Sequence, residues 1–143
     1  MTFKNFDKFQ RNIQKKLVKR PLKNVEKAIA RSTLVVRNTA VKSIQAGGTG
    51  ETVLKYNPRR THTQSAPKQP PASDTGFLVS QISTDVQTHS NGSVVGKIIS
   101  AAPYSKFLEF GTTTMTERPF MQPAIDRNKR KISRIFKDEG LMK

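Results

Sequence analysis

The sequence predicts a mixed α+β fold, in which long N-terminal helices pack on a small antiparallel β-sheet, followed by a short helix near residues 103–110 and a basic C-terminal helix. Apolar residues recur at helical spacing up to Ile44 and again after Pro119. Between these stretches, polar and apolar residues alternate before an Asn-Gly pair and an apolar strand-like run follows it, which is typical of a β-hairpin. A chain of 143 residues is expected to form a single domain, 1–143.

Residues 5–19 have the pattern of an amphipathic, basic helix. Its apolar stripe consists of Phe6, Phe9, Ile13 and Leu17. A basic helix can bind nucleic acid or a membrane surface, but a solvated basic face over a core-packing stripe is the favoured interpretation here. Pro21 is expected to end this helix and to begin a second one, which continues to the Gly47-Gly48 pair.

Residues 46–73 are rich in Gly, Thr, Ser, Gln and Pro and poor in apolar side chains. Proline enforces extended backbone and removes a hydrogen-bond donor. This segment is therefore expected to be a long flexible loop or a contact arm. The Arg59-Arg60 pair within it is a candidate contact for phosphate, although solvation of two arginines in a polar loop is the favoured interpretation.

A hairpin is predicted after a short helix. Asp74 is expected to cap the helix that contains Phe77 and Leu78. From Ile82 to Thr88 the apolar period changes to two, which predicts a half-buried strand. Asn91-Gly92 provides the turn. The returning strand, Val94 to Ala101, is apolar on both parities, as an inner strand would be.

A short helix is predicted after Pro103. Tyr104, Phe107 and Leu108 share one face of it, and Glu109 points roughly opposite. Gly111 suits the left-handed conformation that ends a helix. The β-branched run from Thr112 to Thr116 then predicts a third strand.

The last helix is predicted to begin where two prolines frame Phe120 and Met121. Ile125, Ile132 and Ile135 continue its apolar stripe. The rest of its surface is coated by Arg127, Lys129, Arg130, Lys131, Arg134 and Lys137. Residues 138–143 are expected to be a loose tail.

The formal net charge of +16 is concentrated at the two ends of the chain. Residues 1–31 contain ten lysines and arginines against two acids, and residues 126–143 contain seven against three. This balance favours polyanionic partners or acidic protein surfaces. It makes a basic nucleic-acid-binding protein one candidate, although the sequence contains no recognisable nucleic-acid-binding module.

Motifs that carry chemistry are missing from the sequence. There is no cysteine, and the two histidines stand far apart, so neither a disulfide nor a metal site is expected. There is no Gly-rich phosphate loop and no GxGxxG. No apolar run approaches the roughly 20 residues of a membrane span, and the protein is expected to have no membrane partner. We expect neither an enzyme nor a cofactor.

Three segments resemble the tail-completion, or neck, proteins of long-tailed bacteriophages, which are also described as head–tail joining proteins or minor tail components. They are DTGFLVSQI at residues 74–82, PYSKFLEFGT at residues 103–112, and RPFMQPA at residues 118–124, and they follow the Pro-rich run SAPKQPP at residues 65–71. The resemblance covers about residues 20–140. The first helix and the strong basic charge are not required by the pattern.

The resemblance implies an α+β virion protein that forms a homo-oligomeric ring, commonly a hexamer, at the head–tail junction. It would be made in the host cytoplasm and would join the head connector or adaptor proteins to the tail terminator or tail-tube proteins. The genome DNA would pass through the ring. No catalysis is implied.

Two sets of residues are candidates for contacts in such an assembly. Those for a subunit or partner interface are Glu109, Phe110, Thr112, Arg118 and Phe120. Those for DNA or an acidic surface are Arg59, Arg60, Arg127, Lys129, Arg130 and Lys131. Glu109 is equally well explained as a solvated or locally paired side chain. Phe120 is better explained as a buried lock for the last helix than as an interface anchor.

Overall fold

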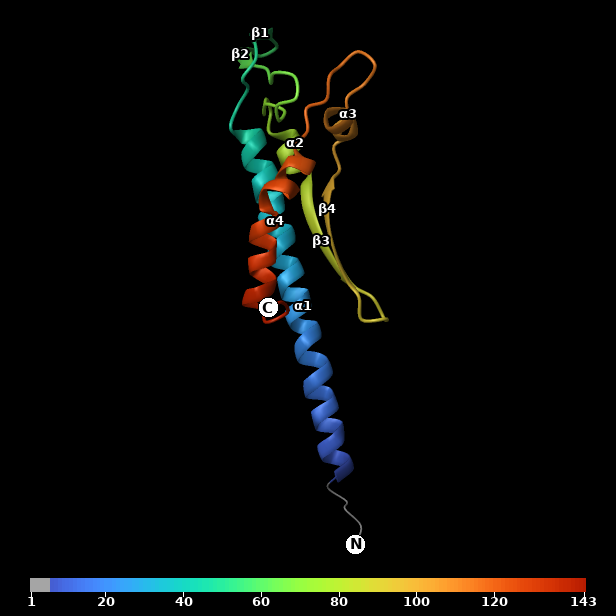
Figure 1. The fold of residues 1–143 in the computed structure, drawn as a ribbon. Coiled ribbons are helices and arrows are strands. Elements are labelled where there is room, and N and C mark those ends of the chain that lie inside the picture. Colours follow the sequence, from blue (N-terminus) through green and yellow to red (C-terminus); the bar gives the residue numbers. More distant parts are fainter. Residues whose placement is uncertain (1–5) are drawn as a thin grey trace.

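The structure, a computed structural model, describes the backbone of residues 6–143 and the side chains of residues 22–143. It confirms the mixed α+β class (Figure 1). Within the described residues the elements are α1 (Phe6–Gln45), β1 (Thr52–Tyr56), β2 (Arg59–Thr63), α2 (Phe77–Ser80), β3 (Ile82–Thr88), β4 (Val94–Ser100), α3 (Ser105–Phe110) and α4 (Met121–Asp138).

The prediction that Pro21 separates two helices was wrong, because α1 is one continuous helix of 40 residues. Proline removes one backbone hydrogen bond, but its ring holds φ at a helical value. Strong helix formers, Lys, Arg and Leu, flank it on both sides. The helix continues through Pro21 although proline removes one bond and its ring crowds the carbonyl group four residues earlier, at a cost of about 3 kcal/mol. The side chains of the predicted stripe at Phe6, Phe9, Ile13 and Leu17 lie outside the described residues.

Helix α4 lies antiparallel along the C-terminal half of α1 (Figure 1). Between them, the buried side-chain amide of Asn128 donates to Thr39 Oγ1 at 2.9 Å and to the Ala124 carbonyl oxygen at 2.7 Å. At the far end, Asn24 Nδ2 donates to the carbonyl oxygen of Glu139 at 3.1 Å. The part of α1 that precedes Asn24 extends beyond α4 and beyond the β3–β4 hairpin (Figure 1).

Glu139 also holds the end of α4 against α1, although residues 138–143 were expected to form a loose tail. Its carboxylate accepts a hydrogen bond from Arg31 at 2.6 Å and lies 3.1 Å from Lys27 Nζ. The side chain of Glu139 is 8% exposed. This residue is therefore part of the helix pair.

The predicted β3–β4 hairpin is confirmed, with Ile82 paired with Ser100 and Thr88 with Val94. One face of it packs on α1 at Gly96. A Cβ atom placed on Gly96 would lie 2.4 Å from a methyl group of Thr33 and 2.6 Å from a methyl group of Ile29. The missing side chain at Gly96 therefore sets how closely the hairpin approaches the helix.

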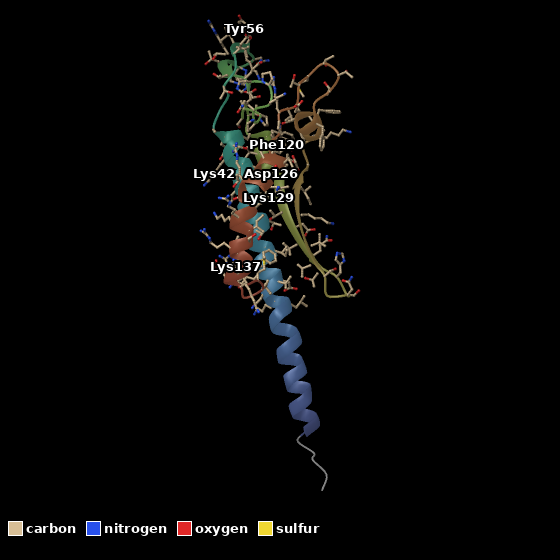
Figure 2. All side chains as sticks on the ribbon, viewed as in Figure 1. Lys42, Tyr56, Phe120, Asp126, Lys129 and Lys137 are labelled. Atoms are coloured by element: carbon tan, nitrogen blue, oxygen red, sulfur yellow. The ribbon has the colours of Figure 1, made fainter. Side chains whose placement is uncertain are left out.

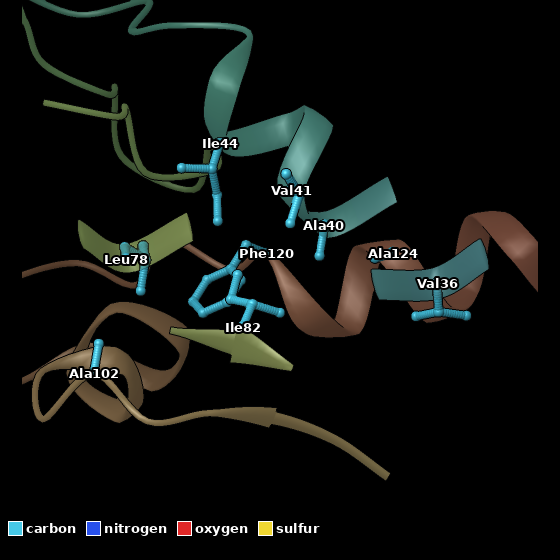
Figure 3. Close-up of a cluster of buried hydrophobic side chains, with 9 residues drawn as sticks. All are labelled: Val36, Ala40, Val41, Ile44, Leu78, Ile82, Ala102, Phe120 and Ala124. Carbon is cyan, nitrogen blue, oxygen red and sulfur yellow. The ribbon is translucent and has the colours of Figure 1, made fainter. Parts of the chain in front are cut away.

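The hydrophobic core forms where α1, α2, β3 and α4 meet (Figure 3). Phe120 is 1% exposed there and contributes the largest of its fully buried side chains. The cluster consists of Val36, Ala40, Val41, Ile44, Leu78, Ile82, Ala102, Phe120 and Ala124. The structure thus places Phe120 in the core, which is the favoured one of its two expected roles.

Two local expectations differ from the structure. Residues 46–73, expected as a long flexible loop or arm, contain the β1–β2 hairpin, in which Thr52 pairs with Thr63. The third strand predicted for Thr112–Thr116 was wrong, because this run forms a turn. The Thr112 hydroxyl accepts from the backbone N–H of Met115 at 3.0 Å. A threonine hydroxyl used in this way competes with the ladder of a sheet.

Glu109 caps α4 from the preceding helix. Its Oε2 accepts hydrogen bonds from the backbone N–H groups of Phe120 at 2.9 Å and Met121 at 3.0 Å, and its Oε1 accepts from that of Gln122 at 2.9 Å. The first N–H groups of a helix have no partner within it, and the side chain of Phe120 supplies no cap of its own. A carboxylate also interacts favourably with the positive end of the helix dipole.

We expect Glu109→Ala to lower the free energy of unfolding by about 2–3 kcal/mol, because it leaves three amides of α4 without their acceptor. Glu109→Gln should cost less, since one acceptor oxygen remains. Chemical denaturation checks both values. The matched control is Glu117→Ala, which removes a half-buried acid from the adjacent turn. Equal losses for Glu109→Ala and Glu117→Ala would contradict the capping role.

Candidate assembly interface

The three segments that carry the resemblance come together at one end of the molecule, around α2, α3 and the start of α4 (Figure 1). The first and second meet where the rings of Phe77 and Tyr104 lie with their centroids 6.2 Å apart. The second and third meet where the backbone N–H of Arg118 donates to the Leu108 carbonyl oxygen at 2.6 Å. The Glu109 cap adds a further link between them.

Gly111 makes the turn between the second and third segments possible. Its φ is +75°, in the region that favours glycine. A Cβ atom there would also lie 2.8 Å from the Met115 carbonyl oxygen and 2.9 Å from the Glu117 nitrogen. Thr112, a predicted interface residue, has its hydroxyl inside this turn.

An aromatic patch, which we define as Phe77, Tyr104, Phe107 and Phe110, lies on this end of the molecule. Phe110 is 81% exposed, and each of the other three is at least 41% exposed. Residues three apart on a helix are surface neighbours, so the aromatic residues of α3 follow one another across its surface. Exposed apolar patches of this kind mark interaction sites on soluble proteins. Of the predicted interface residues, Phe110 belongs to this surface and the buried Phe120 does not.

The β3–β4 sheet has only two strands, so each strand has a paired edge and an open edge. The face turned away from α1 exposes Val95 at 38% and Ile99 at 42%, with Lys97 between them. Open edges are templates for pairing with another chain. This hairpin is therefore a second surface that suits assembly.

The predicted cations fall into two groups. Arg60 is used inside the chain, where its Nε and Nη2 each donate to the Asp74 carboxylate at 3.0 Å. The other candidates are exposed, and they are Arg59, Arg127, Lys129, Arg130 and Lys131. Among these, Lys129 pairs with Asp126 at 2.7 Å. Lys129 and Lys137 lie along α4 (Figure 2), whereas Ala124, Asn128 and Ile135 of the same helix are buried.

Asp74 does not cap α2 as predicted, since the cap position is occupied by Gly76. It instead fastens the β1–β2 hairpin to the body through Lys55 and Arg60. The hydrogen bond from Lys55, and then the hydrogen bond and charge of Arg60, lower the pKa of Asp74 against an opposing effect of burial. An acidic residue near a loop is a poor sequence signal for such a role, because its partners lie 14 and 19 residues away.

Within residues 22–143, no group of three or more His, Asp or Glu side chains is placed to hold a metal ion. None of the described helices is both long and apolar enough to cross a membrane.

We expect Asp74→Asn to release the β1–β2 hairpin, seen as faster hydrogen exchange in residues 50–64 by mass spectrometry. The lowered pKa means that the folded state binds a proton more weakly than the unfolded chain. The wild-type attachment should therefore persist above the ordinary pKa of 3.8 and be lost as the pH falls below it. In Asp74→Asn this acid-induced change should disappear.

The matched control for Asp74→Asn is Asp126→Asn, because Asp126 also has a lowered pKa but bonds only within α4. Unchanged exchange in the hairpin of Asp74→Asn, or an equal change in Asp126→Asn, would contradict the role of Asp74 as its fastener.

Comparison of the chain with protein-family models, with curated proteins and with solved structures finds no match.

Proposed function

We propose that this chain is a structural neck protein of a long-tailed bacteriophage. Copies of it form a ring at the head–tail junction, joining the head connector to the tail, with the DNA passing through the ring. The observation that carries the proposal is the aromatic patch, because the segments that resemble neck proteins are the ones that build and present it.

Two further features support self-association. The β3–β4 hairpin leaves an open edge on each strand, and backbone groups there suit pairing with a neighbouring subunit. Its outward face adds the exposed side chains of Val95 and Ile99. A two-stranded sheet gains stability from additional strands. A ring, commonly a hexamer in the family that the sequence resembles, would supply them.

We expect the protein to form rings, alone or with purified connector and tail proteins, as measured by native mass spectrometry and electron microscopy. Phe110→Asp should abolish these rings, because it places a charge in the most exposed part of the aromatic patch. Its fold should be unaffected, since this side chain is 81% exposed. Met142→Asp, which changes an exposed apolar residue beyond α4, is the matched control.

If the protein stays monomeric under all these conditions, the proposed ring assembly is wrong. Equal assembly of wild type and Phe110→Asp would remove the aromatic patch from the interface.

The second candidate function is binding of nucleic acid, and the exposed basic side of α4 favours it. Arg127, Arg130 and Lys131 are exposed and form no ion pair with a described residue. Unpaired cations on one helix can follow a phosphate backbone without reading its sequence. The two functions are compatible, because a neck ring encloses the genome.

We expect duplex DNA binding to weaken with salt, with a slope of about −0.9 per phosphate contact in a plot of log affinity against log salt. The double variant Arg130→Gln, Lys131→Gln should reduce the slope by up to about 1.8. The control double variant Lys97→Gln, Lys106→Gln removes the same number of positive charges from β4 and α3, outside α4. Fluorescence anisotropy measures both. The same slope in both variants would exclude α4 as the contact.

A further inference from the structure

A pocket of about 300 Å³ lies between the β1–β2 hairpin, the segment before α2, and α3. Phe77, Tyr104 and Leu108 give it an apolar wall, and Arg118 reaches it from the segment before α4. Its volume is at the lower end for ligand sites. It is large enough for one amino-acid side chain and the groups next to it, but not for a folded element.

Arg118 is the unusual member of the lining. Its Nε is buried and donates no hydrogen bond. Its backbone is fixed, because its N–H donates to the Leu108 carbonyl oxygen at 2.6 Å and Pro119 follows it. An unsatisfied buried donor on a charged group is costly. The fold thus holds a guanidinium in place at a pocket wall with its Nε shielded, so that a ligand in the pocket meets its terminal nitrogens.

The one acidic side chain in the lining of the pocket does not pair with Arg118. Asp74 lines the same pocket, but its carboxylate is taken by Lys55 and Arg60. A guanidinium prefers a carboxylate or a phosphate, which it can bind through two parallel hydrogen bonds. The lining is of mixed polarity, because it also includes Lys55, His62 and the Asp74 carboxylate. The negative charge of Asp74 opposes a doubly charged phosphate more than a singly charged carboxylate. The apolar wall suits an apolar group that is attached to that carboxylate.

We propose that this pocket binds the C-terminal residue of a partner polypeptide, with its carboxylate on Arg118 and its apolar side chain against Phe77, Tyr104 and Leu108. The size of the pocket favours a chain end, since a continuous segment would need room both to enter and to leave. The site stands on the pocket and on Arg118 alone, so failure of ring assembly would leave its test unaffected.

The test uses the full chain and the probe N-acetyl-phenylalanine, which carries both a carboxylate and an aromatic side chain. Nuclear magnetic resonance follows the Nε–H signal of Arg118 and the ring signals of Phe77 and Tyr104. We expect saturable shifts in all of them. N-acetyl-phenylalaninamide, which lacks the carboxylate, and acetate, which lacks the apolar group, should each bind at least 10-fold more weakly. N-acetyl-glutamic acid α-amide tests a side-chain carboxylate as the alternative source, and it should also bind more weakly.

A variant separates binding from folding. Arg118→Met removes the unsatisfied donor while keeping an unbranched apolar stem, so Tm should stay the same or rise while binding of the probe is lost. Arg118→Lys keeps the charge without the planar fork and should bind the probe at least 10-fold more weakly. Glu117→Gln is the matched control and should bind as the wild type does.

Three results would overturn the proposal. They are the absence of saturable shifts in the wild-type protein, equal binding of the acid and its amide, and a lower Tm of Arg118→Met. The last would show that the guanidinium stabilises the fold itself. Tighter binding of the glutamic acid probe would show that the pocket binds an acidic side chain and not a C-terminal residue.

Discussion

The arrangement of the domain depends on one carboxylate. Glu109 accepts hydrogen bonds from the first three N–H groups at the start of α4, although it belongs to another helix. This fixes where α4 begins and in which direction it leaves α3. Phe120, the first of the three donors, is thereby held with its ring in the core. Glu109 belongs to the last turn of α3, but its carboxylate lies at the positive end of α4. Charge and hydrogen bonding therefore act together at the start of α4.

Acidic residues recur as fasteners at the other joints. Asp74 ties the β1–β2 hairpin to the body, and Glu139 ties the end of α4 to Lys27 and Arg31. The chain has ten acids against 26 lysines and arginines. Three of these acids, Glu109, Asp74 and Glu139, are used at joints, and Arg127, Arg130 and Lys131 on α4 form no ion pair with a described residue. The strong positive charge of the surface is thus linked to the way in which the fold is held together.

Local patterns could be read from the sequence, but joints between distant segments could not. The β3–β4 hairpin was predictable because period-two alternation and Asn91-Gly92 act over neighbouring residues. The left-handed turn at Gly111 was predictable for the same reason. The Glu109 cap was not, because its acceptor and donors are 11 to 13 residues apart and belong to different helices. The run Thr112–Thr116 has strand propensity, yet the hydroxyl of Thr112 closes a turn instead. Pro21 predicts a break that α1 does not have, because the cost of one proline is small beside the many bonds of a 40-residue helix.

The length of α1 has a consequence for how the positive charge is distributed over the molecule. Residues 6–23 of this helix carry seven lysines and arginines against one acid, and they extend past the end of α4 (Figure 1). At 1.5 Å per residue, they span about 27 Å, which exceeds the Debye length of about 8 Å at physiological salt. The two ends of the molecule are therefore screened from each other. A polyanion that approached from this side would meet the charge of α1 before that of the body.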